Sequence, residues 1–267
     1  TKKFIGECIA NTPYIKFIRC PMSEFHYNTY KHAYTGSLSP DSQYLVDFAI
    51  PNPKNSKIGL YQTSTVKSAI INAPQKWKLK YGLDFRDGKI IGDALKRKSL
   101  EKYSTKYAIM LDNIFKVISD KKGKIFIYHN IVHMSGVMFI EQVLHKNGFI
   151  DENSNSSDNT ICMRCGKIRK KHSKKQITEN KNNKNTHIFT PAKYILIHGE
   201  IDKKTIDNLI EKFNSDGNTD GSKIMILIGS RIMRESYNIK AIQNVFIMSK
   251  PDNIPMLLQI RGRAIRK

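Results

Sequence analysis

Residues 224–230 read Ile-Met-Ile-Leu-Ile-Gly-Ser, an unbroken run of five apolar side chains closed by two small residues. A run of this length without a polar interruption predicts a strand that is covered on both faces. Similar apolar runs lie on either side of it in the chain, at Ile125–Tyr128, Tyr194–Ile197 and Val245–Met248. Such strands are typical of a parallel sheet, because the crossover helices of a parallel sheet cover both of its faces.

Amphipathic helices are predicted between these runs. Ser104 is placed to cap a helix whose apolar side chains recur at helical spacing, namely Met110, Leu111, Ile114, Val117 and Ile118. Residues 136–147 and a stretch capped by Asp202 repeat the pattern, and a final helix begins near Ile254. Strands that alternate with helices predict an α/β fold over residues 101–267, a parallel sheet with helices on both faces.

Residues 1–100 carry turn signals instead of this alternation, with prolines at Pro13, Pro21, Pro40, Pro51, Pro53 and Pro74. We predict an irregular linker or extension of a preceding domain. It would contain a short strand at Tyr14–Ile18 and a helix over Glu24–Tyr34, capped by Ser23. Phe48 and Trp77 are expected to pack in a core rather than to stack on bases. The missing initiator methionine and an end inside a predicted helix lead us to expect a fragment of a longer protein.

The chain of 267 residues is strongly basic, with 45 Lys and Arg against 23 Asp and Glu and a formal net charge of +22. This excess favours a polyanionic partner such as nucleic acid, although a composition rich in Lys, Asn and Ile can also follow from an AT-rich genome. No apolar run approaches the roughly 20 residues that span a bilayer, and no signal peptide is visible. Four cysteines are too few for a disulfide scaffold. We therefore expect an intracellular globular protein with no membrane partner.

The segment 151–193 is too long and too polar to be a plain connection in an α/β domain. It contains Cys162 and Cys165 in a Cys-x-x-Cys-Gly sequence, followed by His172 and His187. The short turn aims both thiolates at one point, and two imidazoles complete the tetrahedral set typical of structural zinc. Such a closed site would fold the insertion rather than catalyse a reaction. The alternative is two buried thiols and two solvated histidines.

Basic residues surround these four positions, namely Lys167, Arg169, Lys170, Lys171, Lys174, Lys175, Lys181 and Lys184. A charge run of this kind is typical of a solvated face. On a segment that a metal folds, it would instead form an ordered cationic surface suited to phosphate contacts.

Small, polar or basic residues follow each predicted strand, in the pairs His129-Asn130, His198-Gly199, Gly229-Ser230 and Ser249-Lys250. Ligands of open α/β sheets bind beyond the carboxyl ends of the strands. These pairs therefore predict a cradle for phosphate groups at one edge of the sheet.

The chain ends in Gln-Ile-Arg-Gly-Arg-Ala-Ile-Arg-Lys, from Gln259 to Lys267. On a helix, Gln259, Arg263 and Arg266 fall on one face, and the apolar Leu257, Ile260 and Ala264 fall on another. Two arginines one turn apart can clamp a phosphoryl group that another domain holds. The alternative is an ordinary basic helix end.

The pattern QxxGRxxR in this segment is motif six of superfamily 2 helicases and translocases, and the chain resembles their second RecA-like domain. Residues 124–130 would be motif four and residues 226–239 motif five. Other stretches resemble proteins of large cytoplasmic DNA viruses, the poxvirus-type early transcription factor small subunit and the related nucleoside triphosphatase. These stretches are residues 19–23, residues 100–114, the Cys-x-x-Cys-Gly sequence, residues 195–201, and Gly229-Ser230-Arg231 followed by Glu235-Ser236.

The resemblance implies that the preceding RecA-like lobe holds ATP with Mg²⁺, and that residues of this chain act on that ATP. Arg263 and Arg266 would reach the γ-phosphate, and Gln259 would couple hydrolysis to movement. Positions beside the nucleotide are implied for Gly262, Glu235 and Asn238. Asn238 stands where many members have Asp, and Ser236 where they have Gly.

The resemblance also implies nucleic-acid contacts for His198, Gly199, Gly229, Ser230 and Arg231. DNA is favoured over RNA as the nucleic acid along which the protein would move. Further partners would be the preceding lobe of the same chain and a viral RNA polymerase or another transcription factor subunit. The implied locations are the viral factory in the host cytoplasm, and the virion.

The chain contains no GxxxxGK[ST] sequence, so by itself it is expected to hydrolyse no ATP. The resemblance implies that it is the C-terminal lobe of an ATP-dependent helicase or translocase in viral early transcription. The alternative is a non-catalytic, zinc-stapled module that binds nucleic acid or docks on a polymerase.

Overall fold

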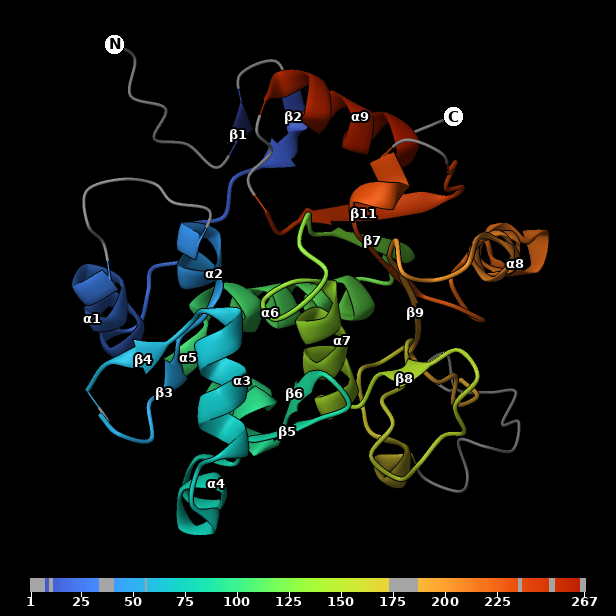
Figure 1. The fold of residues 1–267 in the computed structure, drawn as a ribbon. Coiled ribbons are helices and arrows are strands. Elements are labelled where there is room, and N and C mark those ends of the chain that lie inside the picture. The colour runs from blue at the N-terminus through green and yellow to red at the C-terminus, as the bar shows by residue number, and fades with distance from the viewer. Residues whose placement is uncertain are drawn as a thin grey trace.

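Five parallel strands form the centre of the fold, in the order β11-β7-β10-β9-β8 (Figure 1). Their bounds are β7 Lys124–Tyr128, β8 Ile150–Asp151, β9 Lys193–Ile197, β10 Ile226–Gly229 and β11 Ile242–Ile247. The computed structural model describes residues 8–9, 12–33, 41–55, 57–172, 187–234, 237–249 and 253–264. The sheet confirms the predicted α/β class.

Helices connect the strands in the expected alternation: α6 Thr105–Ser119, α7 Val137–Lys146, α8 Lys203–Asn214 and α9 Ile254–Ala264. Two predicted caps are confirmed. The Ser104 side chain accepts a hydrogen bond from the backbone N–H of Tyr107, and Asp202 accepts one from Thr205. After α6, Gly123 takes a positive φ of 71°, which turns the chain into β7. No helix in the described part of the chain is both long and apolar enough to cross a membrane.

The sheet separates two apolar cores, because alternate strand residues point to opposite faces. On β7, Ile125 and Ile127 join the first core, which α6 and α7 cover. Phe126 and Tyr128 join the second core, which α8 and α9 cover. This arrangement explains why β10 and all but the first residue of β7 and β9 are apolar.

Most of the region before α6 packs on the first core, through residues of the segments from α2 to α5. Its elements are β1 Cys8–Ile9, β2 Thr12–Lys16, α1 Glu24–Ala33, α2 Asp41–Asp47, β3 Ile50–Pro51, β4 Gly59–Leu60, α3 Thr63–Ile71, α4 Gln75–Tyr81, β5 Asp84–Arg86, β6 Lys89–Ile91 and α5 Arg97–Tyr103. Phe48 is fully buried and stacks on Phe139 of α7 with ring centroids 4.9 Å apart, and Trp77 is also buried. Both aromatic residues are therefore core residues, as predicted.

Several elements differ from the sequence expectation. β2 lies two residues earlier than the predicted strand, and β11 begins at Ile242 rather than Val245. The strand β8 is only two residues long, too short for a hydrophobic pattern to reveal it. The helices α2, α3, α4 and α5 were not predicted, since they are short and lie among Pro and Gly residues.

Candidate functional site

The carboxyl ends of four strands meet at one edge of the sheet, which we name the carboxyl edge. Gly229 at the end of β10 pairs with Tyr128 of β7 and with Ile197 of β9. The next residues, Ser230, His129 and His198, therefore lie at the same level. The four polar pairs predicted after the strands are thus brought to one edge, apart from Lys250, which lies outside the described residues.

The residues predicted to contact nucleic acid differ in how much surface they offer. Gly199 and Arg231 are exposed, whereas Ser230 and His198 are 2% and 7% exposed. Gly229 is buried, and a Cβ at this position would lie 2.5 Å from Cγ of Met233. Side-chain contacts at this edge can therefore come from Arg231, while Gly199 offers open backbone.

His198 is buried at this edge. Burial lowers its pKa, which the nearby Glu200 carboxylate only partly opposes. Glu200 lies 3.8 Å from His198 Nδ1 and pairs more closely with exposed His133, with 2.7 Å between Nε2 and Oε1. This pair links the loop after β7 to the turn after β9.

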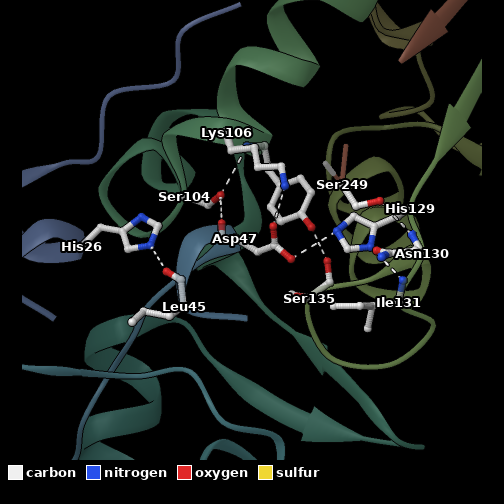
Figure 2. Close-up of polar contacts among 11 residues, drawn as sticks. His26, Leu45, Asp47, Ser104, Lys106, His129, Asn130, Ile131, Ser135 and Ser249 are labelled. Carbon is white, nitrogen blue, oxygen red and sulfur yellow. Dashed lines mark hydrogen bonds and ion pairs between the residues drawn. The ribbon is translucent and has the colours of Figure 1, made fainter. Parts of the chain in front are cut away.

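A buried polar network holds the loop after β7, and no sequence signal pointed to it (Figure 2). Asp47, at the end of α2, is 3% exposed and accepts hydrogen bonds from Lys106 of α6 and from His129, whose Nε2 lies 3.1 Å away. His129 Nδ1 accepts the backbone N–H of Ile131 at 3.1 Å. Because Nδ1 is an acceptor, Nε2 must carry the proton that His129 donates to Asp47.

Two further contacts fix the same loop. The backbone N–H of Asn130 donates to Ser249 Oγ at 3.0 Å, which ties the ends of β7 and β11 together. The Tyr107 hydroxyl donates to the carbonyl of Ser135. Gly136 closes the loop, and a Cβ there would lie 2.0 Å from the Ile131 carbonyl oxygen. The carboxyl edge is therefore preorganised by α2 and α6, which come from distant parts of the chain.

The helix α9 carries the predicted arginine motif next to the second core. Met256 and Ile260 are buried there, and the cap is Asn253, whose Oδ1 accepts the backbone N–H of Met256 at 2.9 Å. Leu257 is half-buried, so the apolar face is centred one residue earlier than predicted. Gln259 is exposed on this helix, and Gly262 has no atom within 4 Å of an added Cβ.

Other predicted nucleotide residues lie partly outside the described residues. Arg263 is on α9, but its side chain is not described, and neither Arg266 nor Glu235 is described. Asn238 is exposed, and its carbonyl accepts a hydrogen bond from Asn214 Nδ2 at 2.9 Å. The roles predicted for these residues stay predictions.

The four predicted metal ligands come together in one cluster. Their ligand atoms, from Cys162, Cys165, His172 and His187, all lie within 4.8 Å of one another. Cys162 Sγ lies 3.3 Å from His187 Nε2, and Cys165 Sγ lies 3.2 Å from His172 Nε2. Around a tetrahedral zinc ion, sulfur and nitrogen ligands stand about 3.6 Å apart, so these residues fit a metal ion.

The cluster is tied to the protein core rather than to a free loop. Ile161 and Met163 belong to the first core, and a Cβ at Gly166 would contact Phe115 and Ile118 of α6. The backbone N–H of Gly166 donates to the Cys162 carbonyl at 2.8 Å, which closes the turn between the cysteines. Burial lowers the pKa of His172, and this favours the neutral imidazole that binds metals.

The cluster and the carboxyl edge lie at opposite ends of β9. Cys162 bridges to Pro191, two residues before β9 begins, whereas His198 follows its last residue. β9 spans five residues, which at about 3.3 Å per residue is about 16 Å, and the two sites lie beyond its two ends. Figure 1 likewise shows the segment after β8 at the lower right, far from α9 at the top.

Part of the chain that forms the carboxyl edge matches a known protein family. Residues 173–267, which include β9, β10, β11 and α9, match the family model of the helicase conserved C-terminal domain. The chain contains a helicase C-terminal domain. The resemblance that the sequence suggested is thereby confirmed.

Relatives of this helicase domain are proteins of large DNA viruses. The chain is 32% identical over 274 residues to the early transcription factor large subunit homolog of African swine fever virus (strain Badajoz 1971 Vero-adapted), with 96% of this chain and 23% of the relative covered. It is 28% identical over 193 residues to the early transcription factor 70 kDa subunit of Fowlpox virus (strain NVSL), covering 72% and 25%. For the same subunit of Yaba monkey tumor virus (strain VR587), identity is 27% over 198 residues. The chain spans about a quarter of these relatives.

Proposed function

We propose that this chain is the C-terminal lobe of an ATP-dependent nucleic-acid translocase or helicase that acts in viral early transcription. The observation that carries the proposal is the carboxyl edge of a five-stranded parallel sheet beside α9, within residues that match a helicase C-terminal domain. The names of the relatives support the role in early transcription.

In this proposal ATP with Mg²⁺ is held mainly by a preceding RecA-like lobe, and its hydrolysis supplies the energy for movement. Arg263 and Arg266 stabilise the negative charge that develops on the γ-phosphate, and Gln259 links that event to the second core through α9. Gly262, Glu235 and Asn238 line the nucleotide side. Gly199 and Arg231 hold the nucleic-acid backbone, while His198, Gly229 and Ser230 shape the edge behind them.

The Cys/His cluster is proposed to bind one structural Zn²⁺. Two thiolates and two imidazoles suit zinc, and a closed set of four protein ligands leaves no position for a reacting water. Cys162, Cys165, His172 and His187 would hold the ion and thereby fix the insertion on α6. We propose DNA as the track, viral transcription proteins as partners, and the host cytoplasm as the location.

The test is ATP hydrolysis by the full-length parent protein, with and without DNA, compared between wild type and Arg263→Ala. The variant is expected to lose hydrolysis by about 10³-fold or more, whereas the Kd for ATP changes only a few-fold. Arg86→Ala is the matched control, because this arginine is exposed on β5 and should leave hydrolysis unchanged.

Two results would contradict the proposal. Equal losses of ATP binding and hydrolysis would remove the phosphate-clamping role of Arg263. Absence of hydrolysis in a metal-loaded, full-length wild type would favour the alternative, a non-catalytic module stapled by zinc that binds nucleic acid or docks on a polymerase.

A further inference from the structure

We propose that the insertion carries a second nucleic-acid-binding surface, formed by Lys167, Lys170 and Lys171 beside the Cys/His cluster. We name it the knuckle surface. It takes the phosphate backbone of a DNA duplex through charge, without reading its sequence. The proposal does not depend on ATP hydrolysis or on the carboxyl edge.

The backbone that carries these lysines is fixed before any ligand binds. The Lys167 carbonyl accepts the N–H of Cys162 at 2.9 Å, and the N–H of Lys170 donates to the Asp158 carbonyl at 3.0 Å. Residues Arg169–Lys171 form a short 3₁₀-helix, η2. The residue before it, Ile168, packs on the first core, and the residue after it, His172, belongs to the cluster. Binding therefore costs little backbone entropy, which favours a real docking surface.

The three ammonium groups are exposed and have no ion pair with any described residue. Two other acidic residues have partners of their own, since Glu152 pairs with Lys212 at 2.9 Å and Asp220 lies 3.8 Å from Arg164. Arg169 differs from the lysines, because its Nη1 donates to the Ser156 carbonyl at 3.1 Å and its guanidinium lies over Phe189. The lysines are thus available to a ligand, whereas Arg169 supports the fold.

A divalent metal ion bound to the Cys/His cluster would not change the net positive charge of the knuckle surface. Two cysteine thiolates offset the two positive charges of a zinc ion, so the cluster is neutral when loaded. The lysines then set the electrostatic potential of the surface. Three cations within five residues form a dense local positive charge, which suits duplex DNA because DNA carries one negative charge per about 1.7 Å of its axis.

The composition of this surface favours nucleic acid over an acidic protein. The cores of protein interfaces are poor in lysine and rich in aromatic and apolar side chains. In the described part of the insertion, Ile188 is the only large apolar side chain that is strongly exposed, at 63%. Phosphate contacts need only flexible cations, and the knuckle surface supplies these.

The test measures binding of the metal-loaded chain to a fluorescein-labelled 20-base-pair DNA duplex by anisotropy, over a range of salt concentrations. The variant Lys167→Gln/Lys170→Gln/Lys171→Gln keeps all four cluster residues and Arg169. The control Lys76→Gln/Lys203→Gln/Lys204→Gln removes three exposed lysines from α4 and α8, so its net charge equals that of the first variant. Metal content and circular dichroism establish that each variant is folded.

The knuckle variant is expected to weaken binding and to lower the slope of log K against log salt by about 1 to 3, since each lost phosphate contact accounts for about 0.9. The control should keep the wild-type slope. An equal change in both variants would overturn the proposal, because net charge alone would then explain binding. An unchanged knuckle variant would also overturn it. A third result would also overturn the proposal: the knuckle variant loses polyglutamate binding but keeps DNA binding. That result would assign the surface to an acidic protein.

Discussion

Asp47 shows how one residue can organise a site that lies far from it in the sequence. Its carboxylate is buried between Lys106 and His129, and its backbone carbonyl accepts the hydroxyl of Ser104, the cap of α6. The same side chain therefore connects α2, α6 and the end of β7. Removing it would leave a lysine and a histidine without their shared acceptor.

Asp47→Ala is expected to lower the free energy of unfolding by about 3 kcal/mol, because breaking a buried ion pair leaves the partner uncompensated. Urea denaturation of the full chain measures this value. Asp93→Ala is the control, since Asp93 is 58% exposed and its pairs with Lys96 and Lys146 are screened by water. The control should cost less than about 1 kcal/mol. A similar loss in both variants would contradict the role of Asp47.

The same residue predicts how stability depends on pH. Burial acts to raise the pKa of Asp47, but the charge of Lys106 and the hydrogen bonds from Lys106 and His129 outweigh it, so the folded pKa lies below the ordinary value of 3.8. A lowered carboxyl pKa contributes stability that is complete above the ordinary value and is lost as pH falls through the folded pKa. The stability gap between wild type and Asp47→Asn should therefore stay constant from pH 7 to about 5 and close below 3.8. Urea titrations across this range test it, and a gap that closes above about pH 5 would argue against the assignment.

At the scale of elements, the insertion shows what local spacing can reveal. Cys162 and Cys165 are close in sequence, and a tight turn brings their sulfur atoms together in any fold that contains it. His187 comes into place only because the segment returns to Pro191 and bridges to Cys162. The sequence therefore suggested all four ligands, and the return of the chain to β9 brought the last one to the others.

Removal of the metal should loosen this element selectively. A chelator or Cys162→Ser is expected to release one metal ion per chain and to speed tryptic cleavage at Lys167–Lys171 by about tenfold or more, because metal binding contributes directly to folding the segment. Metal analysis and timed digestion measure both effects. Cys20→Ser is the control, since Cys20 lies outside the cluster. An unchanged digestion pattern after metal loss would refute a structural role for the ion.

At the scale of the whole molecule, the first core joins residues from both halves of the chain. Phe48, Val66 and Trp77 share this core with Leu111 and Ile127. The predicted boundary between residues 100 and 101 would cut through these contacts. The two regions are therefore expected to depend on each other for stability.

A chain that begins at residue 101 should expose the apolar side of α6 and α7. We expect it to bind the dye ANS and to melt at a lower temperature than the full chain, since each buried aliphatic or aromatic side chain contributes about 1.5–3 kcal/mol. Dye fluorescence and thermal melting measure the change. A truncated chain that melts like the full chain and binds no dye would establish residues 101–267 as an independent domain.

The sequence by itself determined the parallel α/β core, because fully apolar strands and capped amphipathic helices are local signals. It also determined the resemblance to helicase C-terminal domains and the pairing of Cys162 with Cys165, since these depend on short spacings. Only the tertiary structure decided the Asp47–His129–Lys106 network and the joining of the first 100 residues to the core. The network connects residues up to 82 positions apart, and no periodicity along the chain encodes such pairs. The network is stable because a buried carboxylate needs hydrogen-bond partners, and the packing of α2 on α6 and β7 brings these partners within reach of Asp47.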